Sequence, residues 1–78
     1  GLSDYFYIII YNNVALAKMQ INDFESSKGY YEQIIEKLPD INNPRNYSEA
    51  TICQNYGWVL YNLDEGEKGK KYIKKAYP

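Results

Sequence analysis

Two asparagines, Asn13 and Asn55, are the residues whose type and spacing best suit specific chemistry in this chain. A side-chain amide offers both a hydrogen-bond donor and an acceptor, so it can pair with both polar groups of a peptide unit. The two stand at matching places in two similar stretches of the sequence. They therefore point to noncovalent recognition. The alternative interpretation is that both are ordinary solvated residues.

Covalent and metal chemistry have little support in the sequence. The 78 residues contain one cysteine, Cys53, and no histidine. Neither a Cys–His nucleophile nor a metal site built on His or several Cys can therefore form within the chain. We expect Cys53 to be a small buried hydrophobic residue. The carboxylates between Asp23 and Glu36 do not form a plausible acid–base pair. The sequence predicts no catalysis, no metal and no cofactor, and nothing supports the alternative of an accessory piece of an enzyme.

The composition predicts one small folded domain rather than a disordered tail. Hydrophobic residues make up 45% of the chain, and ten are tyrosines. The net charge of −1 argues against a general affinity for nucleic acid. The charge is uneven, at −3 over residues 1–63 and +2 over residues 64–78. The basic end of the chain carries five lysines, Lys68, Lys70, Lys71, Lys74 and Lys75. They could contact nucleic acid, but no base-reading motif accompanies them. A solvated face of a terminal helix is therefore the favoured interpretation.

The sequence also indicates in which cellular compartment the protein is found. A single thiol fits a reducing environment. No apolar run approaches the roughly 20 residues that a membrane helix needs. The apolar stretch 5–11 lacks the basic lead and cleavage site of a signal peptide. We expect a cytoplasmic protein without membrane contact. Because the chain starts at Gly1 and stops at Pro78, we also expect it to be a piece of a longer protein.

Four helices are predicted, over residues 4–20, 24–38, 47–63 and 65–77. Apolar residues spaced by three and four give the first helix an inner face of Ile8, Tyr11, Val14 and Ala15. The alternative for residues 5–11 is a strand, because they are aromatic and β-branched. The length of the apolar pattern, which continues through Met19, favours the helix.

Caps and breakers set the expected helix ends. Ser3 or Asp4 could cap the first helix, Asp23 the second, and Asn46 or Ser48 the third. Pro39 ends the second helix, and a loop rich in Asn and Pro follows over residues 40–47. The second helix would bury Ser27, Tyr31, Ile34, Ile35 and Leu38, and the third would bury Cys53, Tyr56, Gly57 and Leu60. Glycine costs a helix about 1 kcal/mol relative to alanine, which a close approach of two helices would offset at Gly57.

The two pairs of helices look like copies of one hairpin. The shift that superposes Ala15 on Gly57, called the repeat offset below, also brings Asn13 onto Asn55. The same shift places Tyr31 on Ile73 and Ile34 on Ala76. A unit of this size buries its apolar face by stacking on a neighbour.

At these residues the chain resembles the tetratricopeptide repeat family, whose unit is a helix–turn–helix of about 34 residues. The first copy fits the pattern at Tyr11, Val14, Ala15, Phe24, Ser27, Tyr31, Ile34 and Pro39. The second copy fits at Cys53, Tyr56, Gly57, Leu60, Gly69, Ile73 and Ala76. Departures are Lys18 and Gly66, where the family has aromatic residues, and the long linker. The resemblance implies an all-α domain of two stacked antiparallel hairpins, an α-solenoid with repeats at about 8–39 and 48–78.

The resemblance also implies a concave groove lined by the first helix of each pair. The groove residues would be Ile9, Asn12, Asn13, Leu16, Met19 and Gln20 from the first repeat, and Thr51, Gln54, Asn55, Trp58, Tyr61 and Asn62 from the second. Family members that bind peptides place an asparagine where Asn13 and Asn55 stand. Trp58 and Tyr61 are candidate anchors, because aromatic residues dominate interface energetics. The alternative for these two is packing against a following repeat.

These observations lead to an expected role in binding a protein or an extended peptide, in the style of a bacterial regulatory or sensor protein. The alternative is a structural scaffold that associates with itself through its exposed repeat ends and takes no peptide. Replacing Asn13 and Asn55 separates the two hypotheses, because only peptide binding depends on their side-chain amides.

Overall fold

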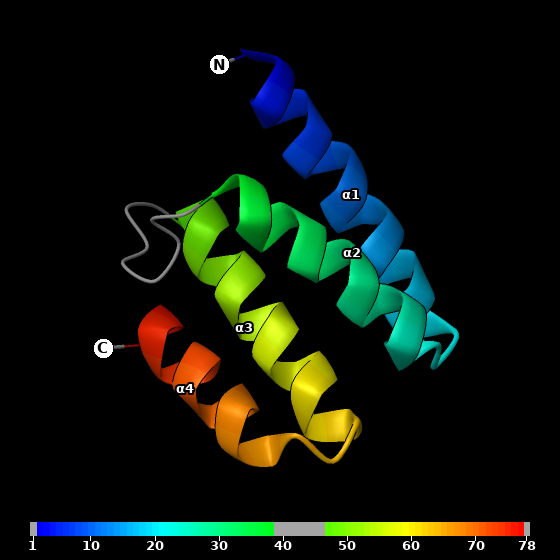
Figure 1. Ribbon diagram of the computed structural model, residues 1–78, viewed down its shortest axis with the longest axis vertical. Helices are drawn as coiled ribbons and strands as arrows, with labels where there is room; N and C mark the ends of the chain where they lie inside the picture. The colour runs from blue at the N-terminus through cyan, green and yellow to red at the C-terminus, as the bar shows by residue number, and fades with distance from the viewer. Residues whose placement is uncertain (1, 39–46, 78) are drawn as a thin grey trace.

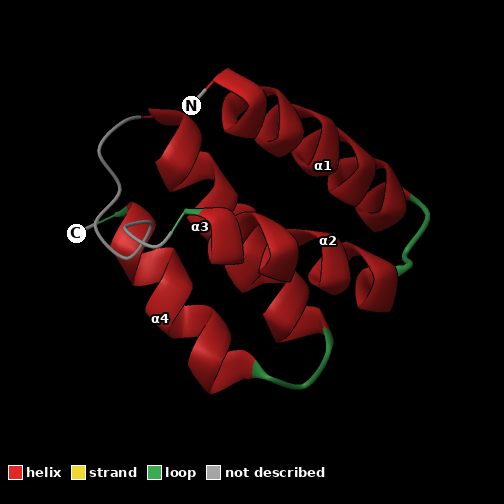
Figure 2. Ribbon diagram, turned by 45° about the horizontal axis from the view of Figure 1, so that its top comes forward, coloured by secondary structure: helices red, strands yellow, loops and turns green. Residues whose placement is uncertain are grey.

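The computed structural model describes residues 2–38 and 47–77, which form four helices (Figure 1). They are α1 (Leu2–Gln20), α2 (Phe24–Lys37), α3 (Tyr47–Asn62) and α4 (Gly66–Ala76). Figure 2 shows helices and short connections and no strand within these ranges. Over these ranges the prediction of an all-α fold with four helices is therefore confirmed. The strand alternative for residues 5–11 is wrong, since they lie inside α1.

The expected caps of the first two helices can be compared with the structure, and one of them is confirmed. Asp23 precedes α2 and its carboxylate accepts from the Ser26 amide at 3.2 Å, as predicted. The expected cap of the first helix is wrong, because α1 already includes Ser3 and Asp4. Asp4 instead stands in the first turn, where the helix dipole favours a negative charge. Ser48 lies inside α3. The other expected features, Asn46, Pro39 and the loop to residue 46, lie outside the described residues.

The connections within the two hairpins recur at the repeat offset. Asn22 and Asp64 both take the left-handed conformation, with φ of 62° and 61°. Asn and Asp are the non-glycine residues that adopt it most readily. The Asp23 amide donates to the Lys18 carbonyl at 2.8 Å, and the Glu65 amide donates to the Leu60 carbonyl at 2.9 Å. Equivalent residues therefore make equivalent turns, so the two hairpins are alike in structure as well as in sequence.

Small residues let the helices of each hairpin approach closely. A Cβ atom added to Gly57 would lie 2.7 Å from the Gly69 carbonyl oxygen, so α3 and α4 touch through their backbones. In the first hairpin the equivalent positions hold Ala15 and Ser27, and the Ser27 hydroxyl donates to the Ala15 carbonyl at 3.0 Å. The close approach predicted at Gly57 is confirmed.

Replacing Ser27 with alanine should lower the free energy of unfolding by about 1 kcal/mol, the usual net value of a buried neutral hydrogen bond. The side chain is fully buried, so no water can replace the lost donor at the Ala15 carbonyl. Urea denaturation followed by circular dichroism measures the change. Ser48→Ala is the control, because Ser48 is an exposed serine inside α3. An equal loss in both variants would show that the hydroxyl of Ser27 contributes nothing specific.

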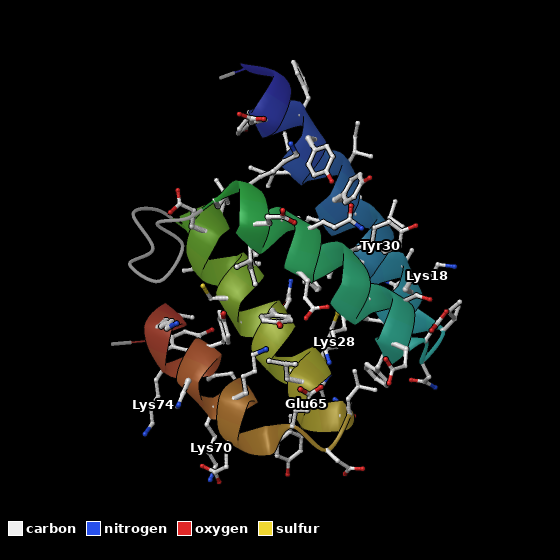
Figure 3. All side chains as sticks on the ribbon, in the orientation of Figure 1. Lys18, Lys28, Tyr30, Glu65, Lys70 and Lys74 are labelled. Atoms are coloured by element: carbon white, nitrogen blue, oxygen red, sulfur yellow. The ribbon has the colours of Figure 1, made fainter. Side chains whose placement is uncertain are left out.

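The core lies where the two hairpins meet. Helices α2 and α3 pack against each other, with α1 against α2 and α4 against α3. The buried apolar residues are Ala15, Tyr31, Ile34, Ile52, Cys53, Tyr56, Val59 and Leu60. The predicted stripe of α2 is confirmed at its centre, while Ile35 and Leu38 are only partly buried. An ion pair of 2.7 Å between Lys28 of α2 and Glu65 before α4 joins the hairpins at the surface (Figure 3).

Candidate functional site

A cleft of about 190 Å³ lies between α1 and α3, the first helices of the two hairpins. It is lined by Tyr5, Ile8, Ile9, Asn12, Asn13, Ser48, Thr51 and Ile52. The walls combine apolar side chains with amide and hydroxyl groups. Such a mixture can bury apolar side chains of a ligand while polar groups fix its orientation.

The cleft brings together four of the residues predicted to line a groove. They are Ile9, Asn12 and Asn13 from α1 and Thr51 from α3. Asn13 is exposed and Asn12 is half-buried. The first helices of the two hairpins therefore share one hollow, and the amide chemistry of α1 lies along it.

A buried tyrosine links the two helices beneath the cleft. The hydroxyl of Tyr31, a residue of α2, donates to Asn12 Oδ1 at 3.0 Å, and the Asn55 side chain is hydrogen-bonded to the same hydroxyl. Burial raises the pKa of Tyr31 to about 12, and the Asn55 bond acts in the opposite direction. Asn12 and Asn55 thus anchor one hydroxyl from opposite helices, which holds both amides in place. Asn13, in contrast, is on the open side of the helix.

The other predicted residues lie elsewhere or contact other partners. Gln54 is exposed and accepts from the Tyr77 hydroxyl at 2.5 Å, which ties it to the end of α4 rather than to the cleft. Trp58 and Tyr61 stack on each other with ring centroids 5.9 Å apart, and both remain half-exposed. The Asn62 amide donates to the Trp58 carbonyl at 2.8 Å. None of these four lines the cleft.

The predicted residues near the end of α1 also lie outside the cleft. Gln20 is exposed and Leu16 is half-buried. The Met19 sulfur contacts the Tyr31 hydroxyl at 4.0 Å, so it supports the buried tyrosine.

The remaining residues of the cleft, which were not predicted to line a groove, are Tyr5, Ile8, Ser48 and Ile52. Ile8 was predicted to lie on the inner face of the first helix. Tyr5 and Ile8 precede Ile9 and Asn12 by one helical turn, and Ser48 precedes Ile52 in the same way. Extending the groove stripe by one turn toward each N-terminus would have found Tyr5, Ile8 and Ser48, because residues three or four apart share a helix face. Ile52 lies between Thr51 and Gln54, inside the range of the predicted stripe, so this extension does not reach it.

The remaining side chains offer no second kind of site in the described part of the chain. No cluster of three or more metal-ligating residues occurs there. Cys53 is buried, and burial raises the pKa of its thiol, which makes it a poor nucleophile. No helix within the described ranges has the length and apolar character required to cross a bilayer.

Comparison of the chain with protein-family models, with curated proteins and with solved structures finds no match. The candidate site therefore rests on its own geometry.

Proposed function

We propose that the cleft between α1 and α3 binds an extended segment of another protein, and that the two hairpins are tetratricopeptide-like repeats stacked as a short α-solenoid. The observation that carries the proposal is the position of Asn13, an exposed amide in a cleft that is also lined by three isoleucines. The repeated turn geometry supports the relation between the hairpins.

The residues that line the cleft would contribute to recognition in different ways. Ile8, Ile9 and Ile52 supply the apolar surface that a ligand side chain would cover. The Asn13 amide can donate to a peptide carbonyl and accept from a peptide N–H, so it can hold an extended backbone of any sequence. Thr51, on the facing helix, adds a hydroxyl. Because Tyr31 already fixes the Asn12 amide, that side chain would lose little entropy when a ligand binds.

The test uses linear peptides selected from a random phage-displayed library on the 78-residue chain. We expect Asn13→Ala to weaken the selected peptides about tenfold, the effect of about 1.4 kcal/mol from lost hydrogen bonds. Calorimetric titration measures the affinity, and circular dichroism shows whether the helices persist. Gln33→Ala is the matched control, because Gln33 is an exposed amide on α2 outside the cleft.

Two outcomes would refute peptide recognition. One is a selection that enriches no peptide. The other is a set of peptides whose affinity falls equally in the Asn13 and Gln33 variants. Asn55→Ala is a poorer test on its own, since it also removes a hydrogen bond to the buried Tyr31.

A scaffold without a peptide ligand is the second candidate function. The stacked, half-exposed pair Trp58 and Tyr61 favours it, because two aromatic rings held together on a surface suit a protein contact. Under this hypothesis, Trp58→Ala would change the sedimentation of the chain, whereas Asn13→Ala would leave its partners bound.

A further inference from the structure

One face of α1 is apolar and uncovered. Phe6 and Ile10 are 55% and 58% exposed, and Ala17 is exposed on the same side. The spacing of four and seven residues places these side chains in one stripe. Scattered exposed apolar residues are common, but a stripe along a helix indicates a surface that can be covered.

The internal repeat shows what the equivalent stripe of the second hairpin does. The repeat offset carries Ile10 and Ala17 onto Ile52 and Val59 of α3, which are 3% and 0% exposed. Both belong to the core that the hairpins share. The stripe that is open on the first hairpin is therefore closed on the second, where the preceding hairpin packs against it.

Besides the hydrogen bond between Tyr31 and Asn55, two contacts join the hairpins across their shared boundary. The Lys28 ammonium meets the Glu65 carboxylate at 2.7 Å, and the rings of Tyr31 and Tyr56 lie 6.3 Å apart. The hydrogen bond from Lys28 lowers the pKa of Glu65, so the pair is ionised at neutral pH.

The same contact can be rebuilt between two molecules by shifting each residue by one repeat. In the second hairpin of one molecule, Lys70 is equivalent to Lys28 and Ile73 is equivalent to Tyr31. In the first hairpin of a second copy, Asp23 is equivalent to Glu65 and Val14 is equivalent to Tyr56. The lysine stays a lysine, the acid stays an acid, and the aromatic pair becomes an aliphatic pair. The second hairpin of one copy is therefore complementary to the first hairpin of another copy, in the same way that the two hairpins within one chain are complementary.

The surfaces concerned are accessible. Figure 3 shows Lys70 and Lys74 on the outer side of α4, pointing away from the other helices. The Lys70 side chain is 65% exposed and makes a long contact of 3.9 Å to Glu67 of its own helix. Asp23 and Ile73 are half-buried. Asp23 accepts from the Ser26 amide and can accept from a lysine as well.

Net charge favours the same arrangement. The C-terminal part of the chain from residue 64 carries +2, and the part before it carries −3. Two copies that meet end to end therefore attract, whereas two copies that meet through the same end repel.

We propose that this chain associates head to tail with a second copy of itself, with α4 of one molecule docked on the exposed stripe of α1 of the next. The contact pairs Lys70 with Asp23 and seats Ile73 beside Val14 and Ile10. Because the two surfaces differ, the contact is heterologous, so each added copy leaves a free end and assembly does not stop at a dimer.

The first test is sedimentation velocity of the chain from about 10 μM to about 1 mM, a range that brackets weak association. The average mass should rise continuously with concentration. Ile10→Glu should weaken association about tenfold, because it places a charge in the apolar contact. Gln33→Glu is the control, since it adds the same charge at an exposed position of α2, which takes no part in the proposed contact.

The second test exchanges the charges of the proposed pair. Lys70→Glu and Asp23→Lys should each weaken association about threefold, the effect of an exposed ion pair. A mixture of the two variants should recover it, because the new glutamate of one molecule then meets the new lysine of the other. Asp23→Lys also removes the cap of α2, so Asp23→Asn, which keeps a capping side chain, provides a variant that folds.

Three results would overturn the proposal. The first is a mass that stays monomeric over the whole range. The second is a mass that stops at a dimer and is unaffected by Lys70→Glu, which would indicate a symmetric contact through α1 alone. The third is a mixture of the charge variants that associates no better than either variant.

Discussion

Replacing Gly57 with alanine should destabilise the protein by about 2 kcal/mol, although alanine is the better helix former by about 1 kcal/mol. The added methyl group would lie 2.7 Å from the Gly69 carbonyl oxygen and 2.7 Å from Ile73 Cγ1. A carbonyl fixed in a helix cannot move aside, so α3 and α4 must separate. Urea denaturation of the variant gives the loss directly, and Gly69→Ala should show a similar one, since its Cβ would lie 2.6 Å from the Gly57 carbonyl.

Gly29→Ala is the matched control for this prediction. Gly29 is also inside a helix, but a Cβ atom there would meet nothing within 4 Å. The substitution should therefore stabilise the protein by about 1 kcal/mol through helix propensity alone. The two glycine variants thus change stability in opposite directions. If Gly57→Ala were neutral or stabilising, α3 and α4 would not touch as closely as the structure has them.

The hairpins could be predicted from the sequence because their determinants are local. The small residues Ala15 and Gly57, the cap at Asp23 and the turn residues Asn22 and Asp64 recur or act within one hairpin. Each of these features depends on a few neighbouring residues and on backbone conformation. The spacing of residues along the sequence records such information well.

The contact between hairpins could be predicted only in part, because it depends on residues far apart in the chain. Cys53 and Leu60 were expected on the inner face of α3, but Ile52 and Val59 are buried as well. The prediction gave α3 one covered face, whereas α2 and α4 both pack against it.

The candidate site shows the same limit. Asn12 and Asn13 line the cleft, on the helix where the family resemblance implied a groove. Gln54 was assigned to the groove by its place in the repeat, yet it bonds to Tyr77 at the end of α4. The role of Tyr31 as a bridge between Asn12 and Asn55 joins three helices, so no pattern within one helix could reveal it.

Raising the pH from 10 to 12 should unfold the protein through its buried tyrosines. Burial raises the pKa of Tyr31 and of Tyr56 from 10.0 to about 12, and both side chains are at most 2% exposed. A raised folded pKa means that the native state binds the proton more tightly than the unfolded state does. The contribution of the protonated tyrosines to the free energy of unfolding is complete below pH 10 and is lost as the pH rises through 12. A shift of this size corresponds to about 3 kcal/mol for each tyrosine.

Tyr31→Phe separates this effect from the deprotonation of lysines in the same pH range. The variant should be about 1 kcal/mol less stable at neutral pH, because the amides of Asn12 and Asn55 lose their shared hydroxyl. It should nevertheless lose about 2 kcal/mol less between pH 10 and pH 12, so the two stability curves converge and cross. Tyr5→Phe, at a 59% exposed position, should follow the unsubstituted chain throughout. Parallel curves for the chain and its Tyr31 variant would mean that the Tyr31 hydroxyl is reached by water, and the bridge between α1 and α3 beneath the cleft would then be absent in solution.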